Sequence, residues 1–106
     1  MAGEIRVRIV KWTTPAQQSA ERFLDLLLGL NSLAAKRASE EIQAATRRLV
    51  YMPTPGRASQ RWPGARELSL VRWKKLIVFK ILPDRISVIA FLDARQDLDV
   101  IDLSEV

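Results

Sequence analysis

Two apolar segments separated by a two-residue turn constrain the fold of this chain more than any other feature. Residues 74–82 read KKLIVFKIL, residues 85–93 read RISVIAFLD, and Pro83-Asp84 separates them. Such a short connection predicts an antiparallel hairpin. Because the first segment is apolar along much of its length, we expect it to be the central strand, covered on part of both faces. Residues 66–71, RELSLV, alternate between polar and apolar and predict a further strand before it.

The first part of the chain predicts one strand followed by a helix. Residues 4–11, EIRVRIVK, alternate with a period of two, which is typical of a half-buried strand. A helix is expected over residues 15–30, with Thr14 as its N-cap and Gln17 completing a capping box. The sequence GLNS at 29–32 is expected to end this helix.

A second helix is expected over residues 33–51, with Asn31 or Ser32 as its cap and Pro53 and Pro55 preventing its continuation. The short connection between the two helices predicts an antiparallel helical hairpin. Apolar residues at spacings of three and four predict one buried stripe on this helix: Ala38, Ile42, Ala45, Leu49 and Met52.

These elements predict an α+β fold in which the helical hairpin packs on one face of an antiparallel sheet. With 106 residues and a hydrophobic fraction of 48%, the whole chain, 1–106, is expected to be a single folded domain. The chain contains neither cysteine nor histidine, so thiolate metal sites and disulfides are excluded and no metal or cofactor is expected. The charged start and the lack of a long apolar run favour a cytoplasmic protein.

Charge is unevenly distributed along the chain, although the net charge is only +5. Residues 57–80 contain seven basic residues and one acidic residue, whereas the segment 93–106 contains five acidic residues and one basic residue. A basic concentration of this kind attracts nucleic acid or an acidic protein. The alternative is a solvated surface with a basic bias.

Four stretches follow one another in the second half of the chain: PGR at 55–57, GARELSL at 64–70, LIVFKI at 76–81 and DRISVIAFLDARQD at 84–97. Together they resemble the RelE/ParE superfamily of bacterial toxins from type II toxin–antitoxin pairs, and its ParE branch in particular. The chain departs from the family pattern at two positions. Asp93 stands where the family usually has histidine, and Lys75 stands near the usual place of a strand tyrosine. In RNA-cleaving members those two groups serve proton transfer or stacking.

RNA cleavage would require a general base, a general acid and cations around the phosphate. Proton-transfer groups are scarce, because histidine is absent and the sole tyrosine, Tyr51, falls on the second predicted helix. Glu67 is the best candidate base, but we favour its interpretation as a strand residue paired with a neighbouring arginine. Lys74 would serve only with a lowered pKa. We therefore assign no catalytic residue.

The ParE resemblance implies inhibition of DNA gyrase by binding. A ribosome-dependent mRNA endonuclease of the RelE type and a degenerate, non-toxic member remain as alternatives. For Arg66, a structural salt bridge with Glu67 or a tail aspartate is an equal alternative to target binding. Trp73 is expected to pack in the protein, whereas Trp62 either packs or contacts a partner. The expected target-binding residues are Arg57, Arg61, Arg66, Lys74, Lys75, Lys80 and Arg95.

The first predicted helix carries more apolar residues than one buried face requires. Phe23, Leu27 and Leu30 form the stripe expected to meet the sheet or the second helix, and Leu24 and Leu28 then lie beside it. The resemblance implies a cognate antitoxin with an acidic and apolar arm, forming a hetero-oligomer with this chain. The residues expected to bind it are Phe23, Leu24, Leu27 and Leu28.

Overall fold

The computed structural model describes residues 9–52, 55–104 and 106. Residues 4–8 of the predicted first strand, and Pro53, lie outside this part of the chain. The elements follow one another as β1 (Ile9–Trp12), α1 (Thr14–Leu30), α2 (Ser32–Tyr51), β2 (Arg57–Ala58), β3 (Arg66–Leu70), β4 (Lys75–Ile81) and β5 (Arg85–Asp93). Two short 3-10 helices, η1 (Val71–Trp73) and η2 (Leu98–Val100), complete them.

The strands form one five-stranded sheet in the order β1-β5-β4-β3-β2, so β4 is central as predicted. Strands β2 to β5 pair antiparallel, but β1 pairs parallel with β5, from Ile9 opposite Arg85 to Trp12 opposite Val88. The prediction of a wholly antiparallel sheet was therefore wrong. The helical hairpin and three strands separate β1 from β5 in sequence, and a connection of that length permits parallel pairing. Strand β2, within the predicted loop, was not anticipated.

Helix α1 begins one residue earlier than predicted. The side chain of Thr13, not Thr14, caps it and accepts a hydrogen bond from the Ala16 N–H at 3.4 Å. The predicted capping box is also wrong, because the Gln17 side chain donates to Glu21 instead of turning back to the cap. Pro15 still lies in the first turn, where no backbone N–H is required.

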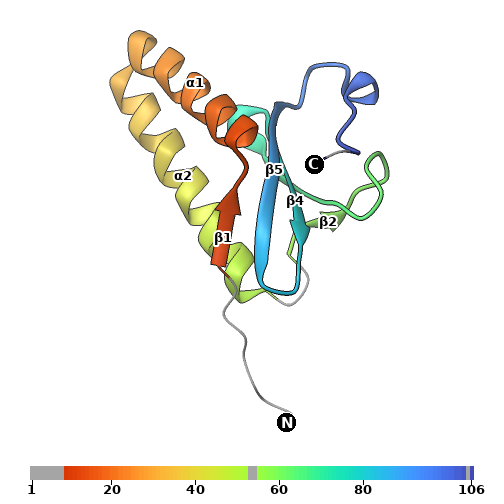
Figure 1. Ribbon diagram of the computed structural model, residues 1–106. Helices are drawn as coiled ribbons and strands as arrows, with labels where there is room; N and C mark the ends of the chain where they lie inside the picture. The colour runs from red at the N-terminus through yellow and green to blue at the C-terminus, as the bar shows by residue number, and fades with distance from the viewer. Residues whose placement is uncertain (1–8, 53–54, 105) are drawn as a thin grey trace.

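Asn31 both ends α1 and begins α2. Its backbone N–H donates to the Leu27 carbonyl at 2.7 Å, and its side-chain oxygen accepts from the N–H groups of Leu33 and Ala34, each at 3.1 Å. One asparagine thus satisfies free groups at the ends of both helices. The antiparallel hairpin that results covers one face of the sheet (Figure 1).

The main core lies between this hairpin and the sheet. Four members of the predicted α2 stripe are buried, but Met52 is 48% exposed, because α2 ends at Tyr51 and Met52 has an extended backbone. The residues of α2 in this core meet Ile77 and Phe79 of β4 and Ile86 and Val88 of β5, all fully buried.

The tip of the hairpin extends past the sheet (Figure 1), which changes the expected pattern on α1. Phe23 packs against the core as predicted, but Leu30 is 76% exposed and does not belong to the buried stripe. Leu24 packs against the core instead of lying beside it, whereas Leu28 is 59% exposed, as expected. No helix within the described residues has the length and apolar character needed to cross a membrane.

The opposite face of the sheet carries a second apolar cluster, which we call the back cluster. It consists of Trp62, Ala65, Leu76, Val78, Ile89 and Ala90. The acidic C-terminal segment lies over it, and Leu98, Ile101 and Leu103 pack against its members. Figure 1 shows this segment, in blue, beside the green loop that follows β2, both on the side of the sheet away from the helices. The sheet is therefore covered on both faces.

Candidate functional site

Gly56 gives the PGR loop its shape. Its φ is 63°, in the left-handed region, and a Cβ atom at this position would overlap the main-chain oxygen of Glu67. The chain can therefore pass close to β3, and the two-residue strand β2 pairs Arg57 with Glu67. The motif places the Arg57 side chain next to the Glu67 carboxylate.

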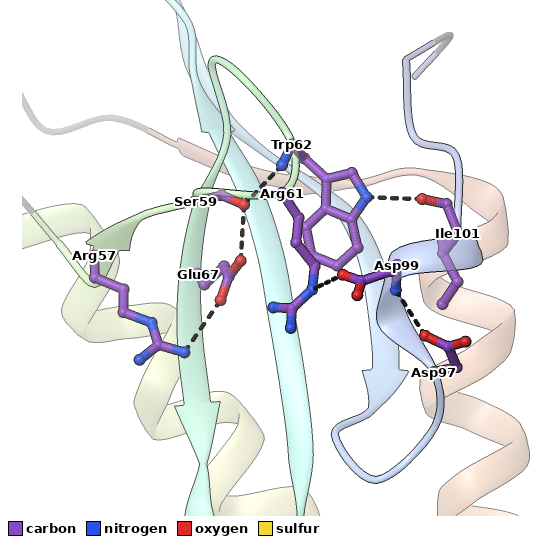
Figure 2. Close-up of polar contacts among 8 residues, drawn as sticks. All are labelled: Arg57, Ser59, Arg61, Trp62, Glu67, Asp97, Asp99 and Ile101. Carbon is purple, nitrogen blue, oxygen red and sulfur yellow. Dashed lines mark hydrogen bonds and ion pairs between the residues drawn. The ribbon is translucent and has the colours of Figure 1, made fainter.

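Glu67 is a buried carboxylate, only 3% exposed. Arg57 donates from Nη2 to Oε1 at 3.2 Å, and the Ser59 hydroxyl donates to Oε2 at 2.7 Å (Figure 2). Ser59 Oγ in turn accepts from the Trp62 backbone N–H at 3.0 Å. A buried charge is stable when it is paired and hydrogen-bonded in this way. The interpretation of Glu67 as a strand carboxylate paired with a neighbouring arginine is confirmed.

Arg61 and Trp62 connect the loop to the acidic segment. Arg61 Nε lies 2.8 Å from Asp99 Oδ1, and the Trp62 indole N–H donates to the Ile101 carbonyl oxygen at 2.9 Å (Figure 2). Trp62 is 7% exposed and is the largest side chain of the back cluster. The question left open by the sequence is thus answered: Trp62 packs within the protein.

Arg66 forms neither of the salt bridges considered from the sequence. Its side chain donates instead to the carbonyl oxygens of Pro55 at 2.6 Å and Gly56 at 3.2 Å. Successive strand residues point to opposite faces, so Arg66 points away from the face that carries Glu67. Arg66 thus fixes the main chain of the loop. These bonds use part of the hydrogen-bonding capacity of the Arg66 guanidinium group within the protein.

The lysines at the start of β4 occupy different positions. Lys74 is exposed and has a φ of 54°, in the left-handed conformation that ends η1. The sequence placed Lys74 in the strand, but the strand begins only at Lys75, so that prediction was wrong. Lys75 is on the helix side of the sheet, with its ammonium 4.7 Å from the centroid of the Phe23 ring and 3.7 Å from Asp93 Oδ2. Trp73 packs edge-on against Phe23, as expected for a structural residue, and donates to Glu41.

Asp93 is held as an anion. Hydrogen bonds from the side chain and backbone N–H of Arg95, together with the nearby Lys75, hold the pKa of the Asp93 carboxyl well below its usual range. A group with so low a pKa is a poor proton donor or acceptor near neutral pH. Arg95, for its part, lies 3.0 Å from Asp93 Oδ2 and remains largely exposed.

The seven predicted target-binding cations do not form one surface. Arg57 and Arg61 lie together and line a polar hollow of about 210 Å³ with Gln60 and Glu67. Lys80 is on the same side of the sheet, where its ammonium donates to the Val106 main-chain oxygen at 2.7 Å. The other four do not line this hollow: Arg66, Lys74, Lys75 and Arg95.

A second concave surface lies on the helical side of the molecule. Residues of α1, α2 and β1 line a groove of about 460 Å³, which we call the hairpin groove. Of the four residues expected to bind an antitoxin, only Leu24 lines this groove. Its other lining residues are Val10, Lys11, Trp12, Gln17, Ala20, Glu21, Ser39, Ile42, Gln43 and Thr46. No group of three or more metal-ligating side chains occurs in the described part of the chain.

Sequence reasoning missed the residues that cover the back cluster. The signal was present, because acidic and apolar side chains interleave in the stretch DLDVIDL at 97–103. Leu98, Ile101 and Leu103 of this stretch pack against the back cluster, and Asp99 pairs with Arg61. Neither interaction is detectable until the sheet brings segments about 40 residues apart into contact.

Comparisons with known proteins agree with this architecture. A solved structure described as the chromosomal ParDE toxin–antitoxin system from P. aeruginosa is similar, with a TM-score of 0.74 and 24% sequence identity. The match covers 84% of this chain and 98% of that chain. A search of curated protein sequences found no match. The family profile described as the ParE toxin of the type II toxin–antitoxin system parDE matches residues 10–98. The chain therefore belongs to the ParE toxin family of type II toxin–antitoxin systems.

Proposed function

We propose that this protein is a cytoplasmic toxin that inhibits DNA gyrase by binding and that a cognate antitoxin neutralises it. Family membership supports the toxin role. The observation that carries the choice of mechanism is the state of two carboxylates: Glu67, which is paired with Arg57 of the basic loop, and Asp93, which lies beside Lys75 at the start of β4. Both Glu67 oxygens accept hydrogen bonds inside the protein, and Asp93 is held as an anion by Arg95. The arginines beside them are suited to electrostatic docking, which requires charge and no proton transfer.

Docking to gyrase or its DNA complex is assigned to the hollow between Arg57 and Arg61. The Arg57 side chain is 71% exposed and that of Arg61 is 42% exposed, so both guanidinium groups are accessible to a partner. Their ion pairs with Glu67 and Asp99 fix their directions without burying them. A prearranged pair of arginines fits phosphates or carboxylates of a target with little loss of side-chain freedom.

The antitoxin is assigned to the hairpin groove. This surface combines a half-buried leucine, Leu24, with polar side chains such as Gln43, as protein interfaces commonly do. It also adjoins β1, which within the described residues pairs only with β5 and so has one open edge. An antitoxin arm can therefore contact both the helices and the strand edge.

The test is induction of the gene in cells with and without the antitoxin. Growth arrest with DNA damage, relieved by the antitoxin, together with inhibition of gyrase supercoiling by the purified protein, is the expected result. Site-specific cleavage of ribosome-bound mRNA, abolished by Glu67→Ala or Lys74→Ala, would instead establish the endonuclease alternative. High soluble expression without any growth defect would contradict the toxin role.

A further inference from the structure

The acidic segment over the back cluster is held differently from the rest of the fold. We call residues 97–106 the strap. Among the described residues, its backbone N–H groups donate only within the strap, as from Ile101 to Leu98 and from Val106 to Leu103. It forms no strand pairing with the sheet in the same part of the chain. The strap therefore lies on the sheet without joining it.

Among the residues that the structure describes, three polar contacts tie the strap to the body. They are the Arg61–Asp99 ion pair at 2.8 Å, the bond from the Trp62 indole to Ile101 and the bond from Lys80 to Val106. The ion pair is exposed, with 42% of the Arg61 side chain and 78% of the Asp99 side chain accessible to solvent. Exposed pairs of this kind are weak and are screened by salt.

The strap also fills its site incompletely. A hollow of about 460 Å³ remains between strap and body, lined by Trp62, Lys80 and Ile89 on the body and by Ile101 and Leu103 on the strap. Leu98, Ile101 and Leu103 are only half-buried. Displacing the strap therefore breaks few close packing contacts. The surface below keeps its shape because, in the described residues, β4 and β5 are paired with each other and not with the strap.

The surface under the strap, which we call the trough, combines an apolar floor with basic edges. The floor consists of Trp62, Leu76, Val78 and Ile89, and Arg61 and Lys80 carry the positive charge. The strap itself demonstrates the chemistry that fits, because it alternates aspartates with Leu98, Ile101 and Leu103. A peptide with this pattern satisfies both floor and edges, whereas a polyanion without apolar side chains would leave the floor uncovered.

We propose that the strap is displaceable and that the trough is a docking site for an extended acidic and apolar peptide segment of a partner protein. Binding exchanges the strap for the partner segment and releases Asp99 from its ion pair with Arg61. The partner is recognised by its alternation of acidic and apolar residues, and the site is separate from the hairpin groove, because the two share no lining residue. The proposal does not depend on gyrase being the target.

The first experiment uses the full chain with the substitutions Leu98→Ser and Ile101→Ser, which weaken the strap without altering the trough. Fluorescence anisotropy measures binding of a labelled peptide with the sequence of residues 96–106. The released variant should bind at least about tenfold tighter than the wild type, whose own strap competes at millimolar effective concentration. Val100→Ser is the matched control, because Val100 is 77% exposed in the same segment, and it should behave as the wild type.

Two further probes decide which chemistry is bound. A peptide of the same composition in shuffled order should bind the released variant about tenfold more weakly, and a single-stranded oligonucleotide of similar charge should bind no better than the shuffled peptide. Equal binding of both peptides, preferential binding of the oligonucleotide, or no binding by a folded released variant would overturn the proposal.

A measurement on the wild type keeps the test independent of the variant's folding. Unlabelled peptide at several millimolar should shift the backbone N–H resonances of Asp99 and Ile101 in the displaced strap, and should leave the indole N–H of Trp73, bonded to Glu41, unchanged. Absence of shifts in the strap, or equal shifts in the strap and at Trp73, would overturn the proposal.

Discussion

At Gly56 the main chain of the PGR loop lies close to β3. A Cβ atom would overlap the Glu67 carbonyl oxygen, and the φ of 63° already disfavours any side chain. We expect Gly56→Ala to lower the free energy of unfolding by about 3 kcal/mol, from backbone strain and the steric overlap together. Chemical denaturation measures this change. Gly64→Ala is the control, because Gly64 has a φ of 83° but open space around it, and it should cost only about 1 kcal/mol. If the two substitutions lowered the free energy of unfolding equally, the backbone would have moved to relieve the overlap at residue 56, and the assigned steric cost would be wrong.

Asp93 gives the molecule a pH dependence at the scale of one side chain. Its pKa is lower in the folded protein than the ordinary value of 3.8, so its stabilising contribution is complete above that value and is lost as the pH falls below it. We expect Asp93→Asn to cost about 1 kcal/mol at pH 7, since the group is partly exposed to solvent. The difference from the wild type should shrink between pH 4 and pH 2.

Denaturation at several pH values measures the Asp93 effect. Asp25→Asn, which removes a negative charge from an exposed position on α1, controls for the change in net charge. A difference between Asp93→Asn and the wild type that stays constant down to pH 2 would contradict the assigned role of Arg95.

At the scale of the elements, the sequence predicted the features that depend on residues close together in the chain, such as helix periodicity and tight turns. The period of α2 identified Ile42, Ala45 and Leu49 as core residues, and the turn at Pro83-Asp84 identified the β4–β5 hairpin. The errors arose where contacts distant in sequence decide the outcome. The parallel pairing of β1 depends on where the helical hairpin ends, and the exposure of Leu30 depends on how far that hairpin extends past the sheet.

In the candidate site, too, the sequence predicted the pairing of a strand residue better than contacts that depend on the tertiary fold. The sequence predicted that Glu67 pairs with a neighbouring arginine, but it did not identify Arg57 as that partner, because Arg57 fell in a predicted loop ten residues away. The bonds from Arg66 to Pro55 and Gly56 were not predicted, because backbone carbonyl groups carry no sequence signal. Nor was the contact of Trp62 with Ile101, which depends on the tertiary fold.

The hairpin groove yields a prediction for α1 and α2 as a unit. Gln43 is exposed and lines the groove, so Gln43→Glu should place a negative charge against the acidic arm expected of the antitoxin without disturbing the core. We expect antitoxin affinity to fall at least about tenfold, equivalent to about 1.4 kcal/mol. Calorimetric titration measures it. Gln18→Glu adds the same charge at an exposed position of α1 that does not line the groove, and unchanged affinity is expected there. Similar losses in both variants would indicate a general charge effect and not occupation of the groove.

At the scale of the whole molecule, the sheet separates two surfaces of different character. The helix side carries the hairpin groove, and the opposite side carries the Arg57–Arg61 hollow and the strap. Antitoxin and target can therefore contact different faces. In that case the antitoxin neutralises the toxin either by blocking the target sterically or by changing the conformation of the opposite face. The structure of the toxin bound to its antitoxin would distinguish these two mechanisms.

The proposed electrostatic docking to gyrase leads to a prediction about salt and charge. Arg61→Ala should raise the concentration needed for half-inhibition of gyrase supercoiling about tenfold. Within the described part of the chain, Arg61 pairs only with the exposed Asp99, so its loss should leave the fold intact. Arg57→Ala also leaves the buried Glu67 carboxylate without its ion pair, so it should reduce both inhibition and stability. Arg57→Lys should retain part of the inhibition, because charge and reach survive while bidentate geometry is lost.

Ionic strength provides the decisive comparison for these variants. Inhibition by the wild type should weaken as salt increases from 50 to 200 mM, because screening acts on exposed charges, and Arg61→Ala should show a shallower dependence. Arg22→Ala, an exposed arginine on α1, is the control and should follow the wild type at every salt concentration. If Arg57→Lys were as inactive as Arg57→Ala while both remained folded, the arginine geometry itself would be required. A role in transition-state stabilisation would then replace docking, because only an interaction of fixed geometry is lost when charge and reach are preserved.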